Sequence, residues 1–324
     1  MNLSREHFIP NLPHDEARAL FKDSIEIIPI SISRHCNRKC DYCPDSFVDR
    51  FSVHDVMGDA LFETIITQLA EIDYSRLVAI NRYNEPLADV EYALSRIKEI
   101  RAALPSAKIE VSTNGDFLDH DVVLSLRDAG VTNLVTTCHA QPGVHNFPHL
   151  RGLLQARIEK LGFPIITVQG TSNWMHVEID AGPGMDFFYR SFDADSRNPD
   201  GSLSAINDRG GSLPVKNIYE RVAPCFRQFK AFEIEWDGSL WPCCQIHNDV
   251  PAHMNYCLGK LTPQSDIFVA WTSLEYVAWR KEMFAYGHKK MPCTNCNFMV
   301  LDGMEHTIEN ARLVARAREE WALG

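Results

Sequence analysis

Three cysteines stand close together near the start of the chain, in a pattern that suits metal chemistry. Cys36, Cys40 and Cys43 lie within the segment SRHCNRKCDYCPD, which covers residues 33–45. A closed structural zinc or iron-sulfur site usually has four protein ligands, whereas a site with three keeps one position open for chemistry. The spacing therefore predicts a metal centre with an open coordination position. A zinc site completed by the neighbouring His35 is the alternative.

A second set of cysteines lies toward the other end of the chain. Cys225 and Cys243 are far apart in the chain, whereas Cys293 and Cys296 form a C-x2-C pair. Four thiols in this arrangement suit either tetrahedral zinc or an iron-sulfur cluster ligated by protein alone. The chain has ten cysteines, and the three outside these sets are Cys138, Cys244 and Cys257. A lone cysteine is usually a small buried apolar side chain, so each of these has a packing interpretation beside a chemical one.

The composition is that of a globular protein. The chain has 324 residues, of which 45% are hydrophobic and 23% charged, enough for one large domain and a small one. A net charge of -11 lacks the basic footprint of a nucleic-acid binder. No apolar run resembles a signal peptide or reaches the roughly 20 residues of a membrane helix. We therefore expect a cytoplasmic protein with reduced cysteines and with neither a nucleic-acid nor a membrane partner.

Short β-branched runs alternate with helical periodicities over the first half of the chain, which predicts parallel strands with crossover helices. The predicted strands cover 25–33, 76–82, 108–115, 132–140 and 164–170. The predicted helices cover 58–72, 90–100, 119–129 and 149–161. Residues 181–215 are rich in Asp, Asn, Ser and Gly and are predicted to form a long loop or domain junction.

A different pattern follows this junction. An Asp237-Gly238 turn between two short apolar runs predicts a hairpin, and helices are predicted at about 271–286 and 304–321. In parallel α/β sheets, ligands gather at the carboxyl ends of the strands. The suggestive polar segments of this chain follow the first four predicted strands: the three cysteines, YNEPL at 83–87, STNG at 112–115, and Cys138-His139.

The first cysteine set resembles the signature of radical S-adenosylmethionine (radical SAM) enzymes. That signature is C-x3-C-x2-C with an aromatic residue, here Tyr42, before the last cysteine. Asn84-Glu85-Pro86 resembles a variant of the family's Gly-Gly-Glu-Pro stretch, which binds the SAM amino group, although Tyr83 and Asn84 replace the usual glycines. Ser112-Thr113-Asn114-Gly115 resembles the segment that approaches the SAM ribose and carboxylate.

The resemblance implies a fold and a cofactor set. The fold is an α/β partial (β/α)6 barrel over residues 25–215, preceded by an extension over 1–24. Cys36, Cys40 and Cys43 would hold a [4Fe-4S] cluster whose fourth iron binds SAM. Reduction of that cluster would cleave SAM to a 5'-deoxyadenosyl radical that removes a hydrogen atom from substrate. The implied SAM contacts are Tyr42, Asn84, Glu85, Ser112, Thr113 and Asn114.

The second cysteine set resembles a twitch domain, the half-length form of the SPASM domain. The resemblance implies a small α+β domain over 216–324 that ends in a helix, with an auxiliary [4Fe-4S] cluster on Cys225, Cys243, Cys293 and Cys296. Four protein ligands leave no iron for substrate, so this cluster is expected to transfer electrons. Asn207-Asp208-Arg209-Gly210-Gly211 resembles an element that precedes such cysteines. Arg209 would meet a substrate hydroxyl or carboxylate, unless the segment is simply a turn.

The expected function is hydrogen abstraction from a sugar, aminocyclitol or similar natural product, with epimerisation or dehydrogenation as the outcome. An epimerase needs a thiol to return hydrogen, and the candidates are Cys257, Cys244 and Cys138. The expected partners are a carbohydrate-like small molecule and an external electron donor such as flavodoxin or ferredoxin. Modification of a ribosomal peptide is an alternative function. A non-catalytic zinc or iron-sulfur protein, for binding or electron transfer, is another.

Overall fold

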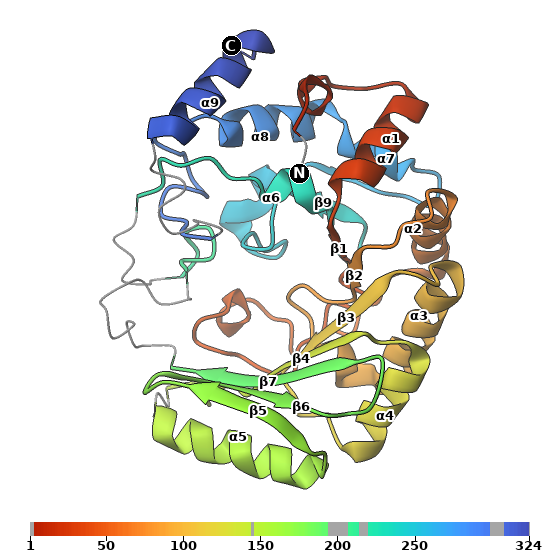
Figure 1. The fold of residues 1–324 in the computed structure, drawn as a ribbon, viewed down its shortest axis with the longest axis vertical. Helices are drawn as coiled ribbons and strands as arrows, with labels where there is room; N and C mark the ends of the chain where they lie inside the picture. The colour runs from red at the N-terminus through yellow and green to blue at the C-terminus, as the bar shows by residue number, and fades with distance from the viewer. Residues whose placement is uncertain (1–2, 144–145, 194–206, 214–219, 299–307, 324) are drawn as a thin grey trace. The chain divides into compact units, whose positions relative to one another are not determined.

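A computed structural model describes residues 3–143, 146–193, 207–213, 220–298 and 308–323 (Figure 1). The chain forms two compact units. The sheet unit consists of Pro29–Gly58 and Leu69–Ile206, and the terminal unit consists of Met1–Ile28, Asp59–Gln68 and Asn207–Gly324. The predicted boundary between residues 215 and 216 lies outside the described residues, and the division into 1–24, 25–215 and 216–324 stays a prediction.

A seven-stranded sheet has the order β1-β2-β3-β4-β7-β6-β5. Its strands are β1 (Ile27–Pro29), β2 (Leu77–Ala79), β3 (Lys108–Thr113), β4 (Asn133–Thr137), β5 (Ile165–Gly170), β6 (Trp174–Ile179) and β7 (Asp186–Phe192). Strands β2, β3, β4 and β7 pair in parallel, with Val78 opposite Ile109 and Leu134 opposite Phe187. The predicted fold class is confirmed as a mixed α/β fold with a mainly parallel sheet.

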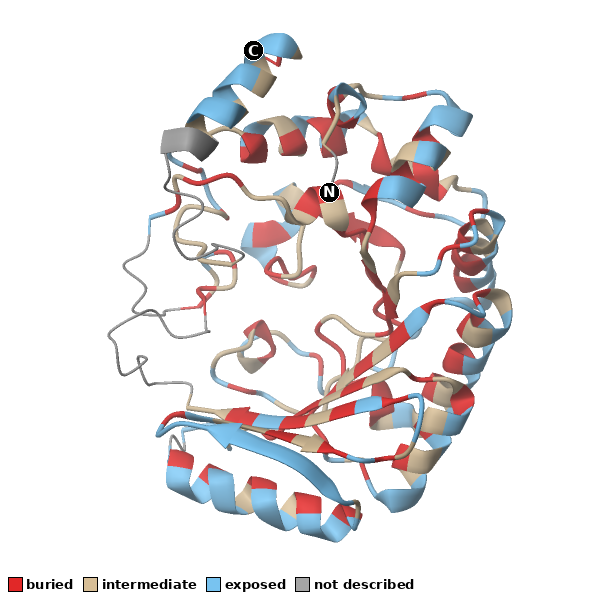
Figure 2. Ribbon diagram, viewed as in Figure 1, coloured by how far each residue is buried: buried red, intermediate tan, exposed pale blue. Residues whose placement is uncertain are grey.

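The helices that connect these strands are α2 (Asp59–Glu71), α3 (Val90–Ala103), α4 (His120–Ala129) and α5 (Phe147–Leu161), with the short η3 (Pro86–Asp89) before α3. Two of them, α4 and α5, end at a left-handed glycine. Asp119 caps α4 by accepting from the Val122 amide, and Gly130 ends that helix in a left-handed conformation. In the central strands β3 and β4, Ile109, Val111 and Leu134 are completely buried, whereas Val135 is half-buried (Figure 2).

Two predictions about the end of this sheet are wrong. The run at 164–170 does form a strand, β5, but it pairs antiparallel with β6 at the sheet edge and is exposed along its length (Figure 2). The predicted loop at 181–215 contains β7, which pairs in parallel with β4. Its sequence DFFYRSF alternates in burial, a period-2 signal that the polar residues after it obscured.

The terminal unit contains the predicted hairpin and most of the remaining helices. Strands β8 (Glu233–Ile234) and β9 (Ser239–Trp241) pair antiparallel around the Asp237-Gly238 turn, and β9 pairs with β10 (Gly259–Lys260). The helices are α1 (His14–Ser24), α6 (Arg227–Lys230), α7 (Ile267–Trp271), α8 (Leu274–Phe284) and α9 (Ile308–Glu320), with the short η1 (Arg5–Phe8) and η4 (Pro251–Tyr256). Within the described residues, no helix combines the length and apolarity required to span a membrane.

Candidate functional site

The first three cysteines lie on an irregular loop that follows β1. The Cys43 amide donates to the Cys40 carbonyl at 2.9 Å, which forms a turn, and the Cys36 amide donates to the Arg50 carbonyl at 2.9 Å. Cys40 is buried, whereas Cys36 and Cys43 are half-buried. We call residues 36–43 the cysteine loop. These backbone bonds hold the loop at two points.

Glu85 is buried at the start of η3, with both carboxylate oxygens engaged. Thr113 Oγ1 donates to Oε1 at 2.7 Å, the Leu87 amide donates to the same oxygen at 3.0 Å, and the Asn114 amide donates to Oε2 at 2.7 Å. Burial raises the pKa of Glu85 to about 7 despite these three donors. A carboxylate has about four acceptor positions, so Oε2 retains room for one more donor. The structure thus brings Glu85 together with the STNG segment, as the resemblance implies.

The turn after β3 brings this segment to the cysteine loop. Asn114 Nδ2 donates to Asn37 Oδ1 at 2.7 Å, while Asn114 Oδ1 accepts from the Asp116 amide. Gly115 has φ = 76°, and a Cβ at this position would lie 2.5 Å from Tyr189 Oη. Only glycine fits this backbone position. Ser112 bonds to Glu110 and Asn81 instead of taking part in this contact.

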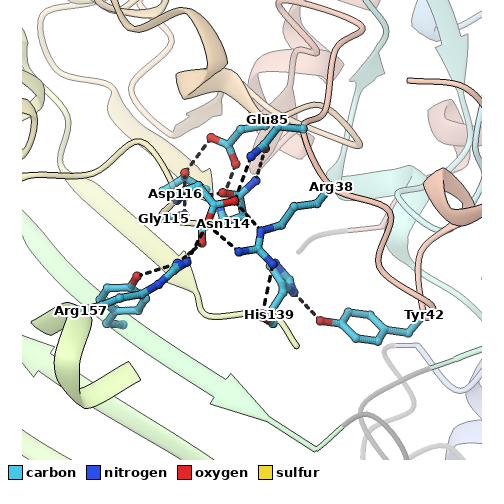
Figure 3. Close-up of polar contacts among 11 residues, drawn as sticks. Arg38, Tyr42, Glu85, Asn114, Gly115, Asp116, His139 and Arg157 are labelled. Atoms are coloured by element: carbon cyan, nitrogen blue, oxygen red, sulfur yellow. Dashed lines mark hydrogen bonds and ion pairs between the residues drawn. The ribbon is translucent and has the colours of Figure 1, made fainter. Parts of the chain in front are cut away.

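Asn84 and Tyr42 each have a partner that the sequence did not indicate. Asn84 Oδ1 accepts from Ser31 Oγ at 3.1 Å, and its Nδ2 donates to Ser33 Oγ at 3.2 Å, so its amide fixes the segment that leads into the cysteine loop. Tyr42 Oη lies 2.5 Å from His139 Nδ1 (Figure 3). Desolvation and the charges of nearby arginines lower the pKa of His139 to about 3, so this imidazole is neutral.

An ion-pair cluster that no motif indicated joins Arg38 of the cysteine loop to Asp116 and to α5 (Figure 3). Arg38 pairs with both oxygens of Asp116, at 2.6 Å each, and Arg157 of α5 donates to Asp116 Oδ1 at 2.7 Å. Arg38 and Asp116 also border a cavity of about 420 Å³, together with Cys40 and Phe51. The cluster is thus placed to affect any metal centre or ligand that binds at the cysteine loop.

The thiols of the first set lie in a desolvated and charged environment. Burial raises the pKa of Cys40 to about 11, although the charge of Arg38 lowers it. Burial and the nearby Asp45 likewise raise the pKa of Cys36. Thiols of this kind become thiolates only when a cation compensates them, which is what a bound metal centre provides.

The second cysteine set gathers around Cys243. Burial raises the pKa of this thiol well above its usual value, and further increases come from the four neighbouring thiols of Cys244, Cys293, Cys296 and Cys225. Cys243 lies two residues after β9, and a turn links Cys293 to Cys296 through a 3.2 Å bond between the Cys296 amide and the Cys293 carbonyl. The charges of the other three cysteines of this set thus act on Cys243, and their joint binding of one cluster stays a prediction.

Arg221 connects the segments that carry these cysteines, and the sequence analysis missed it. This arginine is 1% exposed. Its guanidinium donates to the carbonyls of Ala223 and Pro224, just before Cys225, and to those of Cys296 and Phe298. No spacing rule reveals such a residue, because its acceptors are backbone atoms from two distant segments.

Arg209 lies beside the same cysteines. Its Nη1 donates to Gln245 Oε1 at 2.8 Å, and the Gln245 amide nitrogens lie near thiols: the backbone N at 3.4 Å from Cys243 Sγ and Nε2 at 3.6 Å from Cys244 Sγ. The Asn207–Gly211 segment forms a turn in which Arg209 has φ = 47°. The turn interpretation and the chemical one both remain compatible with this geometry.

The three remaining cysteines differ in accessibility. Cys138 follows β4 and is 1% exposed. Cys244 is half-buried next to the Gln245 amide. Cys257 is half-buried at the end of η4, with its Sγ donating to the Gly259 carbonyl at 3.2 Å. Burial makes Cys138 the least accessible of the three thiols.

Among the described residues, no three Cys, His, Asp or Glu side chains converge in a geometry that could hold a metal ion. Cluster binding therefore stays a prediction at both sets. The donor chemistry nevertheless fits, because each set presents desolvated thiols from one short loop or from facing segments.

Comparisons with known proteins give a family match and a relative for this chain. Residues 225–297 match the SPASM family, described as an iron-sulfur cluster-binding domain. An S-adenosyl-L-methionine-dependent 2-deoxy-scyllo-inosamine dehydrogenase of Niallia circulans is 30% identical over 116 residues, which covers 35% of this chain and 45% of that protein. The match therefore spans less than half the length of this relative.

Two solved structures share the fold. BtrN in complex with AdoMet and 2-DOIA matches with a TM-score of 0.56 and 22% identity, over 80% of this chain and 87% of that chain. Native anSMEcpe with bound AdoMet matches with a TM-score of 0.51 and 14% identity, over 91% and 96%. At such low identities these matches show the fold alone. Together, the comparisons confirm the resemblance of this chain to radical SAM enzymes that carry a C-terminal SPASM-type domain.

Proposed function

We propose that this chain is a radical SAM enzyme that removes hydrogen from a polyhydroxylated small molecule, of the sugar or aminocyclitol class, to form a ketone. The observation that carries the proposal is the network joining Glu85, Asn114 and Asn37. It links the cysteine loop to the two other segments that the resemblance assigns to SAM. A zinc site on the same cysteines would give no reason for these segments to meet there.

The proposed cofactors are SAM and two [4Fe-4S] clusters, one on Cys36, Cys40 and Cys43 and one on Cys225, Cys243, Cys293 and Cys296. When bound, they would supply a radical that takes one hydrogen atom from the substrate carbon and an acceptor for the electron left behind, while the hydroxyl proton leaves to solvent. An external reductant such as flavodoxin or ferredoxin would provide the first electron. The chain's own part is to orient: Glu85 accepts from the SAM ammonium, and Asn114 holds the loop.

Dehydrogenation is favoured over epimerisation by the relative that matches by sequence, which is itself a dehydrogenase. Epimerisation needs a thiol that returns hydrogen to the substrate. Cys257 and Cys244 are the more accessible candidates, and Cys138 is the least accessible. Arg209 is the proposed contact for a substrate hydroxyl or carboxylate, since its guanidinium lies beside the auxiliary cysteines.

The test is anaerobic reconstitution, followed by incubation with SAM, a reductant and a panel of aminocyclitols, glycosides and peptides in deuterated water. Loss of two mass units from an aminocyclitol or sugar, with one 5'-deoxyadenosine per turnover, supports the proposal. Deuterium retained at an inverted carbon would mean epimerisation, and single Cys257→Ala, Cys244→Ala and Cys138→Ala variants would then identify the donor. A chain that consumes no SAM under reduction is an electron carrier or binding protein, and a modified peptide would point to the other substrate class.

A further inference from the structure

Asp116 lies where three segments of the sheet unit meet (Figure 3). From the cysteine loop, Arg38 donates to both of its oxygens at 2.6 Å, and Asn37 Nδ2 donates to Oδ2 at 2.9 Å. From α5, Arg157 Nη2 donates to Oδ1 at 2.7 Å. The Asp116 backbone amide in turn donates to Asn114 Oδ1. One carboxylate thus connects the cysteine loop, the turn after β3 and a crossover helix.

The geometry is that of a strong contact. Bidentate pairing of a guanidinium with a carboxylate is roughly twice as strong as a neutral hydrogen bond and fixes orientation as well as distance. The side chains are largely shielded, at 12% exposure for Arg38, 21% for Asp116 and 23% for Arg157. Burial raises the pKa of Asp116, but the hydrogen bonds from Arg38 and Arg157 outweigh it and bring the pKa to about 2. The carboxylate is therefore ionised at all physiological pH values.

Asp116 differs from the partner in an ordinary ion pair, because its single negative charge balances two positive charges. Two guanidinium groups share one carboxylate, so without it they would face each other across a shielded space. Arg157 has further acceptors in the Asn114 carbonyl and the Tyr189 hydroxyl, and these hold it on the α5 side. Arg38, in contrast, donates to Asp116 and, at 3.3 Å, to the His139 carbonyl. Loss of Asp116 would therefore release chiefly the cysteine loop.

We propose that Asp116 is a positioning residue for SAM: by holding Arg38 and Asn37, it sets the position of the cysteine loop relative to the Asn114 turn. The inference rests on the proposed function, because it concerns the SAM site that Cys36, Cys40, Cys43 and Glu85 would form. It adds a residue that lies outside the cysteine, Glu-Pro and STNG motifs. Asp116 acts through Arg38 and Asn37 and does not itself contact the cofactor.

The experiment uses the full chain, reconstituted anaerobically, with Asp116→Asn, Asp116→Glu and Arg38→Met variants. The matched control is Asp128→Asn, which removes an exposed carboxylate that pairs with Arg127 on α4. Each protein is assayed for iron and sulfide content, for SAM affinity by equilibrium binding, and for the change that SAM causes in the EPR spectrum of the reduced cluster. Thermal unfolding reports on the fold.

We expect Asp116→Asn to bind SAM about ten-fold more weakly, corresponding to one charge-assisted contact, with an altered EPR response to SAM. The iron content should stay near that of wild type, and Asp116→Glu should recover much of the affinity. Asp128→Asn should match wild type in every assay. Combining Arg38→Met with Asp116→Asn should weaken SAM binding no further, because both changes break the same contact.

Wild-type SAM affinity and EPR response in Asp116→Asn would overturn the inference, and so would additive losses in the double variant. If Asp116→Asn does not fold, Arg38→Met carries the same test, since it removes the loop side of the contact and leaves Asp116 paired with Arg157. A wild-type protein that binds no SAM would overturn the proposed function and this role together. If SAM binding depends on Glu85 but is unchanged in Asp116→Asn, only the positioning role of Asp116 would be overturned.

Discussion

The two cysteine regions are built on opposite principles. In the sheet unit, the cysteine loop is held by side chains, through the ion pairs of Arg38 and Asp116 and the amide contact of Asn37 with Asn114. In the terminal unit, the cysteine segments are held through backbone carbonyls, four of which accept from Arg221. Both regions rely on an arginine, but the first arginine has a charged partner and the second arginine donates to main-chain acceptors.

The difference teaches what each region tolerates. Four carbonyl acceptors make Arg221 part of the fold itself, since its loss takes this donor from two buried and two half-buried carbonyls. The ion pairs of the cysteine loop hold a short irregular segment whose displacement leaves the sheet intact. Damage to the first region should therefore appear in ligand binding, and damage to the second should appear in stability. The following predictions test this contrast, in order of decreasing effect.

Replacing Cys36, Cys40 and Cys43 together by alanine should abolish 5'-deoxyadenosine formation, because no SAM-binding cluster can form. About half of the iron should remain, since the proposed auxiliary cluster has four ligands of its own. Iron counting and product analysis by chromatography measure both effects. Loss of all the iron would show that the two cysteine sets do not bind clusters independently.

Arg221→Met should lower the free energy of unfolding by about 4 kcal/mol or more, because it removes four charge-assisted bonds to carbonyls, two of them buried and two half-buried. Urea unfolding measures the change, and iron content should fall with it. The control is Arg151→Met on the exposed face of α5, which should cost little. A stable Arg221→Met protein would erase the contrast drawn between the two regions.

Gly115→Ala should destabilise the protein by about 2 kcal/mol, the approximate cost of a left-handed residue with a Cβ. The added atom would also lie 2.6 Å from Thr136 Cγ2. The control is Gly152→Ala in α5, where the space is open and alanine should slightly stabilise the helix. Equal effects of the two substitutions on thermal unfolding would contradict the close approach of the Asn114 turn to β7.

SAM affinity should rise with pH through about 7, the value to which burial raises the pKa of Glu85. Below that pH the carboxyl is protonated and offers no negative charge to the SAM ammonium; above it the carboxylate is ionised, so binding should level off. Glu85→Gln should bind SAM about ten-fold more weakly at pH 8 and without this pH dependence. A wild-type affinity that is flat from pH 6 to pH 8 would contradict the assignment of Glu85.

Much of the sheet unit could be predicted because its signals are local. Helices α2 to α5 follow apolar periodicity, α3 to α5 begin at polar caps, and β3 and β4 are β-branched runs flanked by these helices. The last part of the sheet could not be predicted in the same way. The direction of a strand depends on the strand with which it pairs. The residues of the exposed β5 and of the alternating β7 do not indicate their pairing partners.

The same division applies to the candidate site. By itself, the sequence determined the two cysteine sets, the Glu85 and STNG segments and the hairpin, because each is a short pattern whose chemistry depends on spacing along the chain. Only the tertiary structure decided that Asp116 meets Arg38 and Arg157, that Arg221 links Ala223 to Phe298, and that Gly115 must lack a side chain beneath Tyr189. These contacts join residues separated by about 40 to 80 positions in the chain. Such pairs come together only when the strands and helices pack. The identity of a charged residue does not predict which distant residue the fold will place beside it.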